Sequence, residues 1–480
     1  MRMGRGTLHL MVAEGIFVLS GWAIHVGAGR ILGESQYGIF VLLLSLLTHY
    51  RIFLATGVNR AVAKYVSEDP SRLRAVERKA LRLQFALGWA LCGLVFLLAP
   101  SLSRLWQKPS LASYIRLTGL FFPAFGLYSV YRGSLNGLKL FGQEALVENV
   151  YSVLKAAFFF ALVYLFRDRV TGAVVGYLVA IVGAIVLARH CLPTREGVPS
   201  APFPLARIVA FAFPVVLLSF GNSLLQSLDL YFLQALLPAE RTAAASSHYG
   251  CAQQFAKIPY LLLYALSLTL FPNVSELASA GKLSETARTI GKALRAGLLL
   301  SLPLAALISA LSPGLIRLVY GGSFVAGAGA LSLLIFGQIF LSFLIVLSNV
   351  ITAGGYPWIS LALVALTAAL SAGANYLLVP AAGIMGAAGA TTVAGAIGMA
   401  SAAVFVRRRF GASLRPLSAL RIVLGSALLY AAARLLAPAG WAVLPAAAGL
   451  FVAYLLLLAV LGEIDADDRK LLRSLMQGSS

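Results

Sequence analysis

Residues 38–63 read GIFVLLLSLLTHYRIFLATGVNRAVA, a predominantly apolar stretch that carries Arg51 near its middle. A run of about 20 predominantly apolar residues is long enough to cross the hydrocarbon core of a bilayer as a helix. Three further cations, Arg132, Lys155 and Lys257, also fall inside long hydrophobic runs. A cation in hydrocarbon costs about 2.5–3.5 kcal/mol on insertion scales, so it persists where it faces a cavity, a partner or a substrate. These four residues are therefore the first indication of what the chain binds.

Composition places the whole chain in the membrane class. Of its 480 residues, 60% are hydrophobic and 11% are charged, and the mean hydropathy of +0.88 is far above that of water-soluble domains. The apolar runs predict about fourteen transmembrane helices, and they lack the period-two alternation of membrane strands. The predicted fold is an all-α integral membrane protein with spans at 7–29, 37–64, 80–100, 113–138, 145–166, 171–192, 207–237, 243–272, 289–318, 327–353, 357–379, 383–406, 416–436 and 440–461.

The distribution of Lys and Arg predicts the orientation of these spans. If the N-terminus is cytoplasmic, cytoplasmic segments hold 25 of the 38 cations, which follows the positive-inside rule and places both termini in the cytoplasm. Basic loops lie against anionic lipid headgroups, so the net charge of +21 needs no nucleic-acid partner. The first span is interpreted as an uncleaved anchor, since its apolar core is longer than that of a signal peptide. We expect a multi-pass protein of a bacterial or archaeal cytoplasmic membrane.

The loops and motifs argue against an enzyme. Between the predicted spans no loop exceeds about 16 residues, which leaves no room for a nucleotide-binding domain. The chain has no GxxxxGK[ST] or GxSxG motif and no His/Cys/Glu cluster with metal-ligand spacing. Its three cysteines form no CxxC pair and are expected to pack as small apolar residues. We therefore predict a protein that is not an enzyme and binds no organic cofactor.

Three landmarks recur in order in the two halves of the chain. They are Tyr37-Gly38 and Tyr249-Gly250, then Val66-Ser67-Glu68 and Val274-Ser275-Glu276, then Asn136 with Gly142 and Asn349 with Gly355. Such a six-span duplication gives two lobes of equal orientation, related by a pseudo-two-fold axis along the membrane normal, with a substrate site between them. The predicted organisation is an N-terminal lobe at 1–192, a C-terminal lobe at 207–408, two added spans at 416–461 and a cytoplasmic tail at 462–480.

Embedded polar residues fall into stripes on single helix faces. One stripe contains Glu148, Ser152 and Lys155, and another runs from Tyr249 through Gln253 and Lys257 to Tyr260. Lipid offers such residues no partner, so the stripes face the interior of the bundle or water.

The embedded charges have two interpretations. In the first, three acids pair with cations: Glu14 with Arg51, Glu148 with Lys155, and Asp229 with Lys257. In the second, the four cations outnumber the three acids and form a cavity for an anionic headgroup. The planar arginine fork suits phosphate best, so Arg51 and Arg132 are the preferred phosphate ligands. The whole predicted substrate site is Arg51, Arg132, Lys155, Lys257, Glu14, Gln253 and Tyr260.

The chain resembles a known family of exporters in three segments: RILGESQYG at 30–38, AKIP at 256–259 and LFPNVS at 270–275. It is similar to the polysaccharide exporter or oligosaccharide flippase family, near O-antigen flippases and stage V sporulation protein B. This family belongs to the multidrug/oligosaccharidyl-lipid/polysaccharide flippase superfamily. The resemblance implies a V of two six-helix lobes whose first, second, seventh and eighth spans line a cationic cavity.

The resemblance also implies a coupling ion. Some relatives place sodium between an acid on span 7 and polar side chains on spans 11 and 12. In this chain Asp229, Asn375 and Thr391 occupy similar places. Sodium or a proton is therefore the expected coupling ion, although Asn375 stands where a second carboxylate is expected.

The expected function is to flip a polyprenyl-pyrophosphate-linked oligosaccharide, a precursor of cell-surface polysaccharide, by alternating access. The expected partners are this lipid-linked substrate, the bilayer and polysaccharide polymerases or glycosyltransferases, with the chain itself a monomer. One alternative is a multidrug/cation antiporter of the same superfamily, which would have a net acidic cavity. The other is a non-transporting membrane scaffold of a polysaccharide-synthesis complex.

Overall fold

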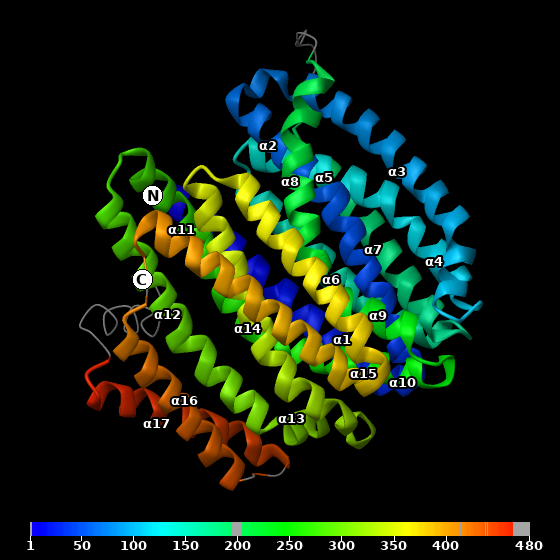
Figure 1. The fold of residues 1–480 in the computed structure, drawn as a ribbon. Coiled ribbons are helices and arrows are strands. Elements are labelled where there is room, and N and C mark those ends of the chain that lie inside the picture. Colours follow the sequence, from blue (N-terminus) through cyan, green and yellow to red (C-terminus); the bar gives the residue numbers. More distant parts are fainter. Residues whose placement is uncertain (1, 194–202, 413, 437, 439, 464–480) are drawn as a thin grey trace. The chain divides into compact units, whose positions relative to one another are not determined.

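The computed structural model describes residues 2–193, 203–412, 414–436, 438 and 440–463 (Figure 1). Within these residues every regular element is helical and no strand occurs, which confirms the predicted all-α class. Ten helical stretches in this part of the chain are long and apolar enough to cross a membrane. The chain is therefore a multi-pass membrane protein, while the number of fourteen crossings stays a prediction.

The chain divides into two compact units, residues 1–250 (unit 1) and 251–480 (unit 2). The division falls inside α10 (Ala239–Ala256). The two lobes expected at 1–192 and 207–408 stay a prediction, as does the pseudo-two-fold axis. Of the expected tail at 462–480, residues 464–480 lie outside the described part of the chain.

Two long helices each join two predicted spans at a glycine: α1 (Arg2–Arg51) covers the span 7–29 and the first part of 37–64, and α15 (Pro357–Phe410) covers 357–379 and 383–406. In α1 the backbone bends at Gly33, with φ 73° and ψ 174°. In α15 it bends at Gly383, with φ 56° and ψ −129°. Glycine has no Cβ and adopts these positive φ values without strain. Gly33 lies in the predicted break between 29 and 37, and Gly383 is the first residue of the predicted span 383–406.

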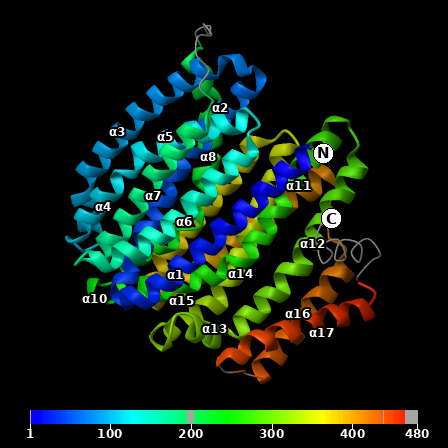
Figure 2. The same cartoon turned by 180° about the vertical axis from the view of Figure 1, so that it is seen from behind.

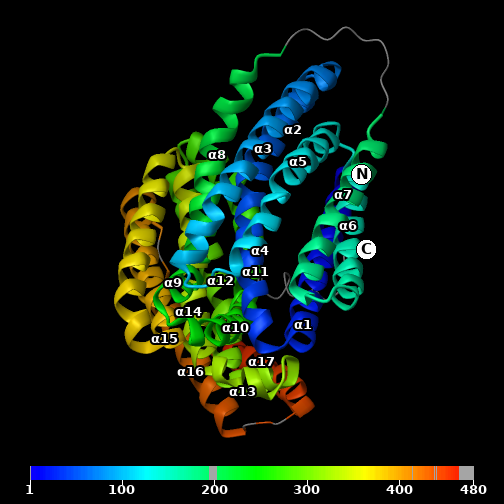
Figure 3. The same ribbon diagram turned by 90° about the vertical axis from the view of Figure 1, so that its right-hand side faces the viewer.

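Unit 1 continues from α1 through a series of shorter helices. They are the π-helical segment η1 (Ile52–Thr56), α2 (Gly57–Glu68), the 3-10 turn η2 (Pro70–Arg72), α3 (Leu73–Leu105), α4 (Leu111–Gly119), α5 (Phe121–Gly137), α6 (Phe141–Leu165), α7 (Arg169–Cys191), α8 (Leu205–Leu225) and α9 (Leu228–Leu236), followed by α10. In this unit α6 packs against α1 and α7 (Figure 2), and α5 packs against both α2 and α3 (Figure 3).

Small residues allow these helices to approach closely. A Cβ on Gly133 of α5 would lie 2.6 Å from the carbonyl oxygen of Asn59 on α2. One turn later, a Cβ on Gly137 would lie 2.8 Å from the carbonyl oxygen of Ala63. This is the small-xxx-small pattern that membrane helices use, because van der Waals contact rather than hydrophobic burial holds them together in lipid.

The two Tyr-Gly landmarks lie on helices that touch in unit 1. Tyr37 and Tyr249 are both fully buried. A Cβ on Gly38 of α1 would overlap the carbonyl oxygen of Ala243 in α10, and a Cβ on Gly250 would lie 2.8 Å from the Val41 side chain. The landmarks therefore mark a close helix–helix contact.

Unit 2 contains the remaining helices: α11 (Ile258–Ser279), α12 (Leu283–Ala310), α13 (Ser312–Val319), the 3-10 segment η3 (Gly322–Gly327), α14 (Ala328–Ala353), α15, α16 (Pro416–Leu436), the 3-10 turn η4 (Gly440–Ala442) and α17 (Val443–Val460). Here α14 packs against α11 and α15, and α12 packs against α16. Glu463, just beyond α17, is 5% exposed and pairs with Arg295 of α12 at 2.9 Å and with Arg421 of α16 at 3.4 Å. This carboxylate joins the chain after α17 to two neighbouring helices.

Candidate functional site

Arg51 lies where the backbone changes from α-helical to π-helical geometry. It is the last residue of α1, and η1 follows it directly. Within η1, the Leu54 carbonyl oxygen accepts a hydrogen bond of 2.7 Å from Nε2 of Gln84 on α3. Both Leu54 and Gln84 are fully buried. Single π-helical turns are frequent at functional sites, and here a neighbouring helix stabilises the turn.

The structure brings Arg51 and Lys155 to the same aromatic ring. The Arg51 guanidinium carbon lies 5.1 Å from the centroid of the Phe17 ring, and Lys155 Nζ lies 4.5 Å from it. Tyr151 and Tyr177 place their ring centroids 5.7 and 5.6 Å from the same Nζ. Such contacts attract a cation without neutralising its charge.

These two cations have no close carboxylate partner among the side chains that the structure describes. No Asp or Glu oxygen of this set lies within 4.0 Å of the Arg51 or Lys155 nitrogens. Lys155 is only 5% exposed. The Glu14 side chain lies outside the described set, so its expected pairing with Arg51 stays a prediction. The Arg51–Lys155 pair is the candidate anion site.

Arg132 has a different environment. Its Nε lies 3.2 Å from Glu144 Oε1, and its Nη1 lies 2.7 Å from Glu148 Oε2. Asn136 donates a hydrogen bond of 2.8 Å to Glu144, and the Tyr128 hydroxyl donates one of 3.3 Å to Glu148. Both carboxylates are buried. Glu148 therefore pairs with Arg132 rather than with Lys155, the partner considered from the sequence.

Glu144 changes the predicted balance of charge. The predicted span began at 145, four residues after the start of α6 at Phe141, and so left out Glu144, which is 4% exposed. Glu144 is a buried acid that the count of three acids against four cations left out, and the expected excess of cations disappears if Glu14 is embedded as predicted. The missed signal was the i, i+4 spacing of Glu144 and Glu148, which places both on one helix face. The local arrangement, rather than the count, decides where positive charge is available.

Asp229 lies in the first turn of α9 and is fully buried. Its Oδ2 accepts a hydrogen bond of 2.5 Å from the Tyr249 hydroxyl, and its Oδ1 accepts one of 2.8 Å from the Leu230 amide. The other expected sodium ligands, Asn375 and Thr391, are buried on α15 in unit 2. No group of three or more His, Cys, Asp or Glu in the described residues is arranged for a metal. The three-residue sodium set stays a prediction.

The remaining predicted ligands belong to unit 2. Lys257 occupies the one-residue break between α10 and α11 and is half-buried. Gln253, one turn earlier in α10, is 4% exposed, and Tyr260 lies half-buried in the first turn of α11. Their role in substrate binding stays a prediction.

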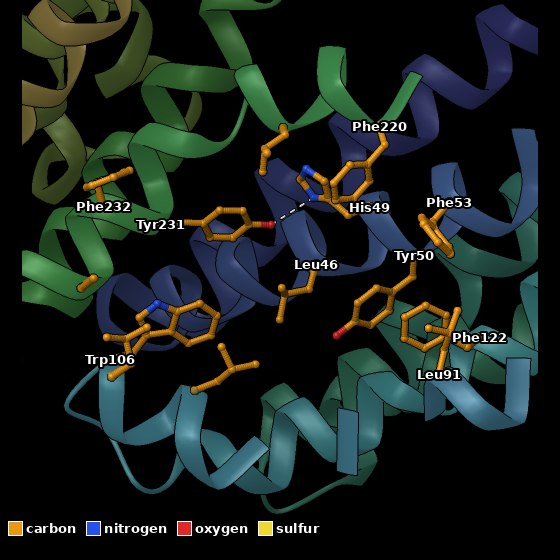
Figure 4. A pocket seen from close by; sticks show the side chains of 14 residues that line it. Leu46, His49, Tyr50, Phe53, Leu91, Trp106, Phe122, Phe220, Tyr231 and Phe232 are labelled. Carbon is orange, nitrogen blue, oxygen red and sulfur yellow. Dashed lines mark hydrogen bonds between the residues drawn. The ribbon is translucent and has the colours of Figure 1, made fainter. Parts of the chain in front are cut away.

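An aromatic cavity, which sequence reasoning missed, lies within unit 1 (Figure 4). Its volume is about 590 Å³, and residues of α1, η1, α3, α5, α8 and α9 line it together with Trp106. Two stacked ring pairs contribute to its wall: Tyr50 with Phe122, whose centroids are 4.1 Å apart, and Trp106 with Tyr231, at 6.2 Å. The ring pairs join segments far apart in the sequence, so no local motif revealed them.

Comparison with known proteins agrees with this architecture. Residues 3–278 match the family described as polysaccharide biosynthesis protein. An uncharacterized membrane protein of Methanocaldococcus jannaschii is 24% identical over 389 residues, which cover 75% of this chain and 74% of that protein.

Two solved structures show the fold. The lipid II flippase MurJ in an inward closed conformation matches with a TM-score of 0.77 and 15% identity, covering 94% of this chain and 98% of its own. An inward-facing multidrug resistance MATE family transporter of the MOP superfamily matches with a TM-score of 0.69 and 15% identity, covering 85% of this chain and 98% of its own. The expected family and fold are confirmed.

Proposed function

Because the chain belongs to the polysaccharide biosynthesis protein family, we propose that it flips a polyprenyl-pyrophosphate-linked oligosaccharide across the cytoplasmic membrane by alternating access. The family description supports a polysaccharide precursor as the cargo. The fold shared with a lipid II flippase and with multidrug transporters supports a role in transport. A pyrophosphate that crosses hydrocarbon needs charged partners, as any ion in the membrane does.

The observation that carries this proposal is the Arg51–Lys155 pair at Phe17. The aromatic rings attract both cations and leave their charge available to an anion. The Arg51 guanidinium supplies two parallel donors to a phosphate, and Lys155 supplies a compact charge beside it. Arg132, in contrast, already has two carboxylate partners, so we assign it a structural role in place of the phosphate contact expected from the sequence.

The cargo proposal extends to the other predicted residues. Lys257, Gln253 and Tyr260 are proposed as further substrate ligands contributed by unit 2. Sodium at Asp229, Asn375 and Thr391, or a proton, is proposed as the coupling ion. Polysaccharide polymerases or glycosyltransferases are the proposed neighbours in the membrane.

Reconstituted proteoliposomes test the assignment of Arg51. The measured quantity is the rate at which a fluorescent lipid-linked oligosaccharide becomes accessible to a membrane-impermeant quencher. Removing one partner from a desolvated charge pair costs about 2–5 kcal/mol, so Arg51→Ala should slow flipping by about 30-fold or more. Arg51→Lys should retain part of the rate, because it keeps the charge and loses the fork.

Arg60→Ala is the matched control, since Arg60 lies on the exposed face of α2. Its flipping rate should equal that of the unmodified protein. Thermal unfolding in detergent would establish that the Arg51 variants are folded. A fully active Arg51→Ala protein would remove Arg51 from the site.

The antiporter alternative has one observation in its favour. Two buried carboxylates, Glu144 and Glu148, face the single cation Arg132, so this group is locally acidic. In an antiporter, Glu148→Gln would abolish uptake of an organic cation and Arg51→Ala would leave it unchanged. In the flippase, Arg51→Ala would slow movement of the lipid-linked oligosaccharide and Glu148→Gln would leave it unchanged. A scaffold would transport neither substrate.

A further inference from the structure

One face of the helix that carries Arg51 forms the wall of the aromatic cavity. Leu46, His49 and Tyr50 of α1 line the cavity, and Phe53 of η1 lines it further along. At 3.6 residues per turn, each of these residues points 100° or more around the helix from Arg51. The cavity and the candidate anion site therefore use different faces of the same helical segment.

The chemistry of the lining selects an apolar occupant. None of the 14 lining residues is Lys, Arg, Asp or Glu. The polar atoms at one wall bond to one another: Ser45 Oγ donates to the Tyr231 hydroxyl at 2.7 Å, and that hydroxyl lies 3.0 Å from His49 Nδ1 (Figure 4). A charged or sugar headgroup would therefore lose its hydration at this wall without gaining an ionic partner.

The size of the cavity limits what it can hold. A volume of about 590 Å³ falls in the range of roughly 300–1,000 Å³ that is typical of sites for one small molecule. Stacked rings on two sides, Tyr50 with Phe122 and Trp106 with Tyr231, offer broad apolar faces for dispersion contacts. The cavity fits part of one hydrocarbon chain.

The rim connects the cavity to the lipid-facing surface. Among the lining residues, Leu105 is 60% exposed and Phe53 is 38% exposed. Further along α3, Leu97 is 78% exposed and Phe85 is 56% exposed, as expected of a helix whose outer face contacts lipid. Water needs two to four polar partners to be held in a cavity, and acyl chains are the most abundant apolar groups beside this rim.

We propose that the cavity is a binding site for one acyl chain of a bilayer lipid, which packs against the α1–η1 face that lies away from Arg51. The chain fills the space that protein side chains leave open beside Phe53 and supports the π-helical turn from that side. The headgroup stays at the rim. This proposal does not depend on the identity of the transported cargo.

Trp106, which lines the cavity and is 5% exposed, provides a reporter for the test. Replacing the other four tryptophans, Trp22, Trp89, Trp358 and Trp441, by Phe leaves Trp106 as the sole emitter. The full-length variant is placed in nanodiscs of phosphatidylcholine brominated in its acyl chains, and its fluorescence is compared with that in unbrominated lipid. A bromine atom quenches only on close approach, so quenching of Trp106 reports a chain inside the cavity.

We expect strong quenching of Trp106 and its loss when the cavity is filled. Ala235→Leu adds volume from α9 and Leu91→Phe adds it from α3, both at lining positions. Two separate filling variants guard against one that fails to fold, which thermal unfolding of each would reveal. A variant that retains only Trp358, which is 77% exposed, gives the quenching of a tryptophan on the surface and should be unaffected by Ala235→Leu.

Three results would overturn the proposal. The first is Trp106 emission that is equal in brominated and unbrominated lipid. The second is quenching of Trp106 by aqueous iodide, which would show a water-filled cavity. The third is relief of bromine quenching by a few mole per cent of polyprenyl phosphate but not by the same amount of unbrominated phosphatidylcholine, which would assign the site to a polyprenyl chain instead.

Discussion

Two groups of cations in unit 1 are stabilised in opposite ways. Arg132 contacts two buried carboxylates at 3.2 and 2.7 Å, whereas Arg51 and Lys155 contact aromatic faces. Both groups involve α6, which carries Glu144 and Glu148 near its start and Lys155 two turns later. One helix therefore contributes to an ion-pair network and to a site where positive charge stays available.

The difference separates a structural cation from one suited to recognition. A buried ion pair satisfies both partners and offers little to a third charge. A cation beside an aromatic ring keeps its charge and its hydrogen-bond donors. In a membrane protein the useful question is therefore what each embedded cation already contacts, rather than how many cations there are.

The largest expected effect concerns Arg132. Replacing it by Leu leaves Glu144 and Glu148 buried without a cation, which costs about 3–5 kcal/mol. The melting temperature in detergent should fall accordingly. The triple variant Arg132→Leu, Glu144→Gln, Glu148→Gln should recover most of the loss. If the single variant unfolds at the temperature of the unmodified protein, the network does not stabilise the fold.

Gln84→Leu should have the next largest effect. It removes the donor to the Leu54 carbonyl inside η1, and the net contribution of one such hydrogen bond is about 0.5–1.5 kcal/mol. Because η1 follows Arg51, the variant should also slow flipping more than its loss of stability explains. Ser129→Ala serves as the control: it removes a contact of 3.5 Å with Gln84 and the hydrogen bond of 2.8 Å from Ser129 Oγ to the Gly126 carbonyl oxygen, and it keeps the bond from Gln84 to Leu54. Equal melting temperatures for Gln84→Leu and the unmodified protein would show that the bond is dispensable.

Glu463 extends the comparison to a carboxylate beyond the last helix. Burial alone would raise its pKa, but hydrogen bonds from Ser418, Arg295 and Arg421 and the charge of Arg295 bring the net pKa below the ordinary value of 4.5. A lowered folded-state pKa favours the ionised folded form, so its contribution is complete above pH 4.5 and is lost as the pH falls through the folded value.

Thermal unfolding between pH 3 and pH 7 measures this contribution. Stability should decrease on the acid side in the unmodified protein. Glu463→Gln should be less stable at neutral pH and should show a flatter profile. Parallel profiles for the two proteins would mean that Glu463 titrates with an unshifted pKa.

The smallest effect on stability is expected for Lys155→Met. It removes cation–π contacts that are each worth about 0.5–2 kcal/mol, but it also removes a desolvated charge, so the net change should be within about 1 kcal/mol. Binding of a short-chain polyprenyl pyrophosphate, measured by calorimetry, should nevertheless weaken by about tenfold, the equivalent of roughly 1.4 kcal/mol. A large loss of stability with unchanged binding would make Lys155 a structural residue like Arg132.

Much of the candidate site was predictable because burial in a membrane is a property of local sequence. The stripe of Glu148, Ser152 and Lys155 was identified from helical spacing, and all three are buried. Arg51 was identified because a cation in an apolar run is costly in hydrocarbon unless it faces a partner, a cavity or a substrate. The aromatic partners Phe17 and Tyr177 were not predicted. The sequence shows that they lie in apolar spans, but only the packing of neighbouring helices shows which cation they contact.

The sequence by itself determined that this is an all-α membrane protein, and it predicted breaks between apolar runs near Gly33 and Gly383, where the structure has bends in α1 and α15. Hydropathy and glycine conformation act locally and can be evaluated along the chain. Only the tertiary structure decided that Arg132 pairs with Glu144 and Glu148 while Arg51 and Lys155 share an aromatic ring. Those contacts join α5 to α6, and α1 to α6. The interaction energy between an embedded charge and its neighbours depends on distances of a few ångströms, which are set by how the helices pack.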